Sequence, residues 1–74
     1  MQSRNSFLRL YTIVRLLLSH KCPTAGALAE RFEVSRKTIN RDMEFLRDQW
    51  GLEIEYDSGQ RGYLLQGDMS GAAL

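Results

Sequence analysis

Along residues 7–18 the hydrophobic positions recur with the spacing of an amphipathic helix that buries a wide stripe. The run is interrupted only by three polar residues, which share one side of the helical wheel: Arg9, Thr12 and Arg15. Asn5 or Ser6 is the expected cap at its start, because a short polar side chain can accept hydrogen bonds from free backbone N–H groups. Pro23 then prevents continuation, since proline has no N–H group to donate.

Two shorter helical patterns follow, over residues 25–32 and from Arg36 to residue 49 or 50. Thr24 and Ser35 are the expected caps of these helices, and Gly51 is the stop signal of the second one. Ile39, Met43, Leu46 and Trp50 share its buried side.

Only Glu33 and Val34 separate these two helices. A connection this short forces a large angle between them and places one residue, expected to be Glu33, in or near the left-handed region of backbone space. Glycine is common at such positions, so Glu33 is expected to cost about 1 kcal/mol of backbone strain. The pattern of two short helices joined by a tight turn predicts a helix-turn-helix.

After Gly51 the period of the pattern changes to two. Three apolar residues alternate with three acidic ones in the order Leu52, Glu53, Ile54, Glu55, Tyr56 and Asp57. The spacing predicts a strand with one buried face and one solvent-exposed face. A glycine-containing turn and a second short strand complete a β-hairpin over residues 52–66, with Gln60 and Arg61 at its tip and Tyr56 paired with Tyr63.

Together these elements predict one domain over residues 1–66, mainly α with a small β-hairpin. Residues 67–74 lack periodicity and are expected to be a linker or a disordered tail. A chain of 74 residues has little room for a large catalytic cleft, so we expect no enzyme activity. Cys22 and His20 offer too few ligands for structural zinc, and no metal or other cofactor is expected. The sequence shows neither a membrane span nor a signal peptide, which favours the cytoplasm.

The net charge of +1 is unevenly distributed. Residues 1–29 carry four basic side chains and no acidic one, whereas residues 51–74 carry four acidic side chains and one basic one. This separation suits a protein that presents a basic side to phosphates, although an ordinary solvated surface has the same appearance.

The polar side of the third predicted helix carries most of the candidate chemistry. Its basic residues are concentrated in the first two turns, where free N–H groups and the helix dipole also attract a phosphate. Arginine and lysine can donate hydrogen bonds to guanine. Asn40 can form two hydrogen bonds with adenine, one through its amide oxygen and one through its amide nitrogen. A solvated helix face is the alternative interpretation of this row. Asp42 is expected to pair with an arginine, Arg41 or one from the first helix, and to have no catalytic role.

The motif VSRKTINRD at residues 34–42, with Leu46 after it and the pair Gly62 and Tyr63 downstream, resembles a known family. Over about residues 7–66 the chain is similar to the winged helix-turn-helix of DeoR-type repressors and, especially, of WYL-domain transcriptional regulators. In that family the third helix enters the major groove and the wing touches the minor groove or the backbone. The resemblance implies DNA contacts by Ser35, Arg36, Lys37, Thr38, Asn40, Arg41, Gln60 and Arg61. Thr24 is a further expected DNA contact, because its hydroxyl can donate to a phosphate.

The resulting hypothesis is a bacterial transcription regulator that binds double-stranded DNA, acting as a repressor that occludes a promoter. A homodimer on DNA is expected, and the family places dimerisation in a C-terminal WYL domain that this chain does not contain. Two alternatives remain open. The domain could serve protein interaction, or it could be the regulatory N-terminal domain of a larger enzyme, such as a bifunctional biotin ligase.

Overall fold

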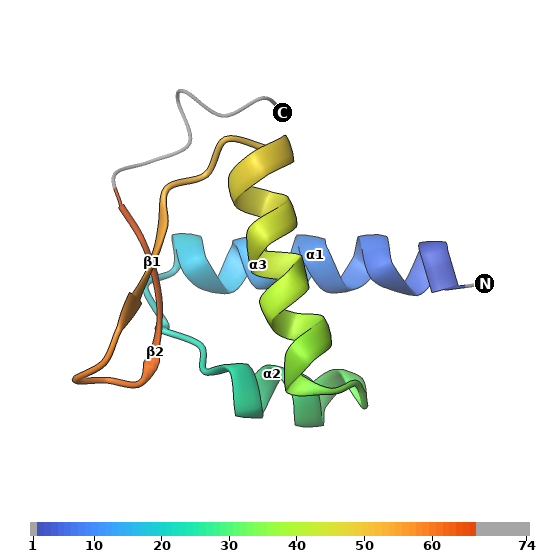
Figure 1. Ribbon diagram of the computed structural model, residues 1–74, viewed down its shortest axis with the longest axis horizontal. Coiled ribbons are helices and arrows are strands. Elements are labelled where there is room, and N and C mark those ends of the chain that lie inside the picture. The colour runs from blue at the N-terminus through green and yellow to red at the C-terminus, as the bar shows by residue number, and fades with distance from the viewer. Residues whose placement is uncertain (1, 67–74) are drawn as a thin grey trace.

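The computed structural model describes residues 2–66, which form three helices followed by one antiparallel hairpin (Figure 1). The elements are α1 (Gln2–Leu18), α2 (Ala25–Phe32), α3 (Arg36–Gln49), β1 (Ile54–Asp57) and β2 (Gly62–Leu65). This order confirms the predicted fold class, a three-helix winged helix-turn-helix. The predicted linker or tail at residues 67–74 lies outside the described residues.

Helix α1 is longer than its apolar pattern predicted. It begins at Gln2, so Asn5 and Ser6 lie inside the helix and the prediction that either residue caps it was wrong. The apolar stripe marks the part of a helix that packs on the core, whereas the first turns of α1 extend beyond the core (Figure 1). The C-terminal end is as expected: α1 stops at Leu18, and His20 follows in the left-handed conformation with φ 57°.

The core lies where the three helices meet. Its largest buried side chains are less than 2% exposed and come from all three helices: Ile13, Leu17, Leu28, Ile39, Met43 and Leu46. Complete burial of one such side chain contributes roughly 1.5–3 kcal/mol. The predicted buried side of α3 is therefore confirmed, and Trp50 packs at its edge.

The helix-turn-helix has the local geometry that the sequence predicted. Thr24 caps α2 by accepting from the Ala27 N–H at 3.0 Å, and Ser35 caps α3 by accepting from the Thr38 N–H at 3.1 Å. Glu33 lies in the left-handed region with φ 57° and ψ 45°, which confirms the strained position. These three residues fix where each helix begins or ends, and thus the angle between them.

The hairpin has the register Ile54↔Leu65 to Asp57↔Gly62. The predicted pairing of Tyr56 with Tyr63 is confirmed, with ring centroids 5.4 Å apart and an edge-to-face angle of 70°. The expected alternation holds less well at the tip: Ile54 is buried, but Tyr56 is 54% exposed. Tyr56 lies near the end of β1, where it lines an open cleft with the start of α2 and of α3 and so stays largely exposed.

Strand β2 is held on its other side by the segment that links α1 to α2. The Tyr63 N–H donates to the Pro23 carbonyl at 2.9 Å. A Cβ atom at Gly62 would overlap the Cys22 carbonyl oxygen and lie 2.7 Å from its Sγ. Only glycine permits this approach, and the wing is thereby fixed to the helical body.

Candidate nucleic-acid interface

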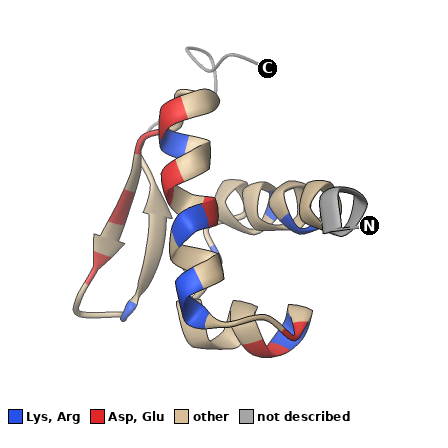
Figure 2. Ribbon diagram, turned by 45° about the vertical axis from the view of Figure 1, so that its right-hand side comes forward, with Lys and Arg blue, Asp and Glu red and all other residues tan. Residues whose placement is uncertain are grey.

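The solvent side of α3 carries a row of exposed basic and polar residues opposite its buried stripe. Ile39 and Met43 are fully buried, whereas Lys37, Asn40 and Arg41 are exposed. Figure 2 shows that most basic positions of α3 lie in its N-terminal half, whereas acidic positions lie in β1, from the middle of α3 to its end and at the end of α2. Within residues 2–66, neither Lys37 nor Arg41 forms an ion pair. Both side chains are available to an external anion.

A buried ion pair holds α3 against α1. The Arg9 guanidinium donates through Nε to Asp42 Oδ2 at 2.5 Å and through Nη2 to Asp42 Oδ1 at 3.1 Å, and each residue is 7% exposed. The expectation that Asp42 pairs with an arginine of the first helix is confirmed. The assignment of Arg9 to a polar side was wrong, because this contact brings it into the core. The hydrogen bond with Asp42 raises the pKa of Arg9 above its usual value, although burial acts in the opposite direction.

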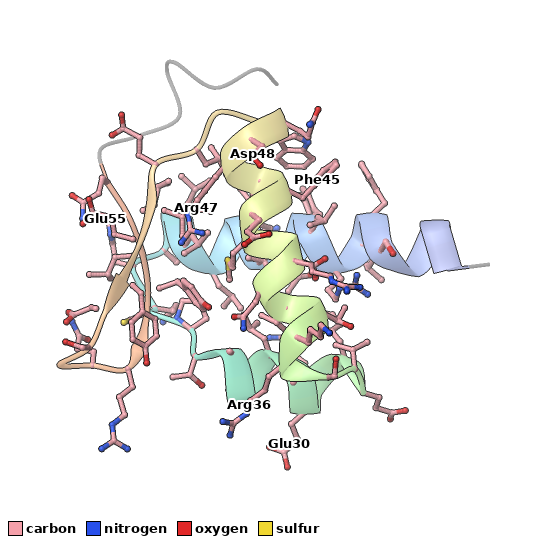
Figure 3. All side chains as sticks on the ribbon, viewed as in Figure 1. Glu30, Arg36, Phe45, Arg47, Asp48 and Glu55 are labelled. Carbon is pink, nitrogen blue, oxygen red and sulfur yellow. The ribbon has the colours of Figure 1, made fainter. Side chains whose placement is uncertain are left out.

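A cleft of about 290 Å³ lies between the start of α2, the start of α3 and the wing. Its lining includes three of the predicted site residues, Thr24, Arg36 and Arg61. The Arg36 guanidinium crosses α2 at Gly26, where an added Cβ atom would lie 2.9 Å from Nη2. In Figure 3 the Arg36 side chain extends beside α2 and away from the core. The structure thus brings two cations and a helix N-terminus together at one opening.

Two predicted site residues, Ser35 and Thr38, already form hydrogen bonds at the N-terminal cap of α3. The Ser35 and Thr38 hydroxyls lie 3.1 Å apart, and Ser35 also accepts from the Thr38 N–H. These hydroxyls order the first turn of α3. Any contact they make with DNA has to share oxygens that already have partners.

Two further predicted site residues, Asn40 and Gln60, form hydrogen bonds with residues of the wing. Asn40 Oδ1 accepts a hydrogen bond from the Tyr63 hydroxyl at 2.6 Å. Gln60 Nε2 donates to Asp57 Oδ2 at 3.0 Å, which ties the tip of the hairpin to its own first strand. Arg61 is exposed, with φ 58°. The tip therefore presents Arg61 while Gln60 supports the turn.

Arg47 belongs to the structure of the wing and not to the exposed row. Arg47 is half-buried, and its Nε donates to the Ile54 carbonyl at 2.8 Å. Figure 3 shows its side chain directed from α3 toward the hairpin. A backbone carbonyl at the start of β1 therefore has a charged donor, which helps to fix the position of the wing.

Sequence reasoning missed three residues of this surface. Gly26 and Tyr56 line the cleft, and Tyr63 contacts Asn40. A glycine in the first turn of a helix was a detectable signal, since it leaves space for a neighbour. No local pattern could link Tyr63 to Asn40, because 23 positions separate them.

Comparison with protein families gives a match over residues 9–64 to the family described as HTH domain. The chain belongs to this family. The chain is also similar to a protein of Thermotoga maritima named "Probable transcription repressor NiaR", with 42% identity over 66 residues. That alignment covers 88% of this chain and 36% of the relative, so the chain spans about a third of the relative's length. No solved structure gives a significant match.

Two further properties concern only the described part of the chain. None of the helices within residues 2–66 has the length and apolar character needed to cross a membrane. The same residues contain no group of three or more histidine, cysteine, aspartate or glutamate side chains placed to hold a metal ion.

Proposed function

We propose that this domain binds double-stranded DNA through α3 and regulates transcription, acting as a repressor that occludes a promoter. Membership of the HTH domain family and the similarity to a probable repressor support this function. The observation that carries it is the exposed row on α3, where Lys37 and Arg41 have no ion pair within residues 2–66. In this arrangement α3 enters the major groove, and Arg36, Lys37, Asn40 and Arg41 face the bases and phosphates.

The cleft beside α3 takes a backbone phosphate of the same duplex. Arg36 and Arg61 supply positive charge, and Thr24 and the start of α2 supply donors. Ser35, Thr38 and Gln60 contribute by ordering the elements that carry these groups. Contacts of this kind set the position of the protein on DNA, whereas contacts to base edges select the sequence.

The remaining properties of the regulator extend this proposal. It acts in the cytoplasm, by binding DNA and not by catalysis. The motif at residues 34–42 favours the DeoR-type or WYL-domain group of regulators. On DNA it forms a homodimer, assembled through a C-terminal domain outside this chain. Half-sites about 34–36 Å apart would suit two copies of α3 in successive major grooves.

Selection of bound fragments from a pool of random duplexes tests the proposal. The chain should enrich a short shared sequence, and Arg41→Ala should weaken binding to it by about 1–3 kcal/mol while relaxing the choice of base. Arg15→Ala is the matched control, since Arg15 is an exposed arginine of α1 that lies over the Tyr11 ring and outside the proposed interface. Equal effects of the two variants, or no enrichment by the wild-type chain, would contradict the proposal.

One observation favours a second candidate, a winged helix that binds another protein. Four large apolar side chains of α1 are exposed: Phe7 at 65%, Leu8 at 60%, Tyr11 at 51% and Leu18 at 43%. This candidate predicts little salt-dependent affinity for duplex DNA. The selection described above separates the two functions, because only the first yields an enriched sequence.

A further inference from the structure

The hydrogen bond between Tyr63 and Asn40 connects the wing to the exposed side of α3. The Tyr63 hydroxyl donates to Asn40 Oδ1 across 2.6 Å. Tyr63 is 8% exposed, whereas Asn40 is exposed beside Arg41 in the row proposed to face DNA. The hydroxyl of the buried Tyr63, in the wing, therefore holds the amide oxygen of Asn40, whose side chain is exposed to solvent.

The position of Tyr63 does not depend on Asn40. Its backbone N–H donates to the Pro23 carbonyl at 2.9 Å, and its ring packs edge-to-face with that of Tyr56, with the ring centroids 5.4 Å apart. The neighbouring Gly62 lies against the Cys22 backbone. A tyrosine hydroxyl keeps its proton at neutral pH, and burial raises the pKa of Tyr63 further from that range, so this group can donate. The phenol is thus a fixed donor to which the amide of Asn40 must adapt.

The two ends of an asparagine amide have opposite chemistry. Oδ1 only accepts hydrogen bonds and Nδ2 only donates them, and half a turn of the amide exchanges their positions. With Oδ1 held by Tyr63, both N–H groups of Nδ2 remain for an external acceptor. An amide released from Tyr63 would present either end at similar cost.

We propose that Tyr63 is a positioning residue that sets the Asn40 amide with its N–H donors toward the DNA, and thereby determines which bases are accepted there. This inference rests on the proposed function. In the major groove, purine N7, guanine O6 and thymine O4 are acceptors, whereas cytosine presents only the N4 amino donor. Asn40 therefore selects against cytosine on the contacted strand, and one lone pair of Oδ1 is still free to accept from adenine N6.

The test compares Tyr63→Phe with Tyr11→Phe in selection from random duplexes. Both variants lose one hydroxyl, but Tyr11 lies on α1 and is 51% exposed, so its variant should select as the wild-type chain does. The wild-type chain should exclude cytosine at one position, and Tyr63→Phe should reduce that exclusion about tenfold while leaving the other positions unchanged. Asn40→Ala should lose the preference at the same position, and the double variant should match Asn40→Ala alone.

A second measurement needs no DNA. The side-chain amide of Asn40 gives two N–H signals in a nitrogen-15 NMR spectrum, and these should shift in Tyr63→Phe but not in Tyr11→Phe. Unchanged signals would show that the hydrogen bond is absent in solution and would overturn the inference.

The selection has four further outcomes that would overturn the inference. A preference for cytosine would mean that Oδ1 and not Nδ2 faces the DNA. A Tyr63→Phe variant that binds every duplex more weakly by the same factor would have a structural defect only. Absence of any enriched sequence for the wild-type chain would remove the proposed function and this inference with it, whereas enrichment that Tyr63→Phe leaves intact would remove the inference alone.

Discussion

At the scale of single residues, several polar contacts of this chain orient α3 and the wing relative to the rest. Arg9 of α1 forms an ion pair with Asp42 of α3, and Arg47 of α3 donates a hydrogen bond to the Ile54 carbonyl. Desolvation offsets much of the attraction within a buried ion pair, so such a pair adds little net stability compared with a well-packed apolar pair. Its effect here is geometric, because a two-point contact allows only one rotation of α3 against α1.

Removal of one partner of the Arg9–Asp42 pair should therefore be costly. Asp42→Ala leaves a buried guanidinium without its carboxylate and should lower the free energy of unfolding by about 3–5 kcal/mol. The double variant Arg9→Met with Asp42→Leu should lose far less, because it leaves no buried charge. Urea unfolding measures both, and equal losses in the two proteins would contradict this account.

Tyr63 gives the chain a predictable response to alkaline pH. Its pKa is raised by burial, so above about pH 10 the unfolded state loses this proton before the folded state does. The stabilisation is complete below the unfolded pKa and is lost as the pH rises through the raised folded value. Urea unfolding between pH 8 and pH 11 should therefore show a decline that is smaller in Tyr63→Phe, and an identical decline in both proteins would exclude this role.

At the scale of elements, the helix-turn-helix depends on capping and on one strained residue. Thr24 and Ser35 define where α2 and α3 begin. Glu33 ends α2 in the left-handed conformation, in which its Cβ atom is crowded by the backbone. The turn is therefore held by the packing of the two helices and not by the preference of its own residue.

Glu33→Gly should stabilise the domain for this reason. Relief of the strain exceeds the extra freedom of glycine in the unfolded chain, and we expect a gain of about 0.5–1 kcal/mol in the free energy of unfolding. Glu33→Ala is the control, because it removes the same carboxylate but keeps the Cβ atom. A gain in the alanine variant of the same size would attribute the effect to charge and not to backbone strain.

At the scale of the whole molecule, the basic side chains proposed to meet phosphates lie apart from the acidic side chains of the hairpin. The basic start of α3 and Arg61 border the same cleft, whereas the acidic residues of β1 lie along the body of the hairpin (Figure 2). Repulsion from DNA should therefore keep the strands of the hairpin away and allow only its tip to approach.

The salt dependence of binding should distinguish residues that bind phosphates from residues that bind bases. Removal of one cation that neutralises a phosphate should reduce the slope of log affinity against log salt by about 1, so Arg61→Ala should have a shallower slope than the wild-type chain. Asn40→Ala should bind more weakly with an unchanged slope, because its proposed partner is a base. Fluorescence anisotropy with a selected duplex measures both slopes, and identical slopes for Arg61→Ala and the wild-type chain would argue against phosphate binding by Arg61.

Much of the fold could be predicted because its signals are local. The caps at Thr24 and Ser35, the strained Glu33 and the buried stripe of α3 follow from side-chain chemistry and helical spacing within a few residues. The start of α1 could not be predicted in this way, because polar residues continue a helix without any periodic signal. The exposure of Tyr56 was missed because it depends on the cleft that separates the tip of the hairpin from the starts of α2 and α3.

The candidate site likewise has one part that local spacing predicts and another that it does not. The amino-acid sequence alone placed Arg36, Lys37 and Arg41 on the outer side of a helix, since a period of 3.6 residues decides which side chains oppose an apolar stripe. Only the tertiary structure decided that Arg9 is buried with Asp42, that Arg47 supports the wing and that Tyr63 holds Asn40. These contacts join residues of different elements, and their formation depends on how the elements pack, which no local spacing records.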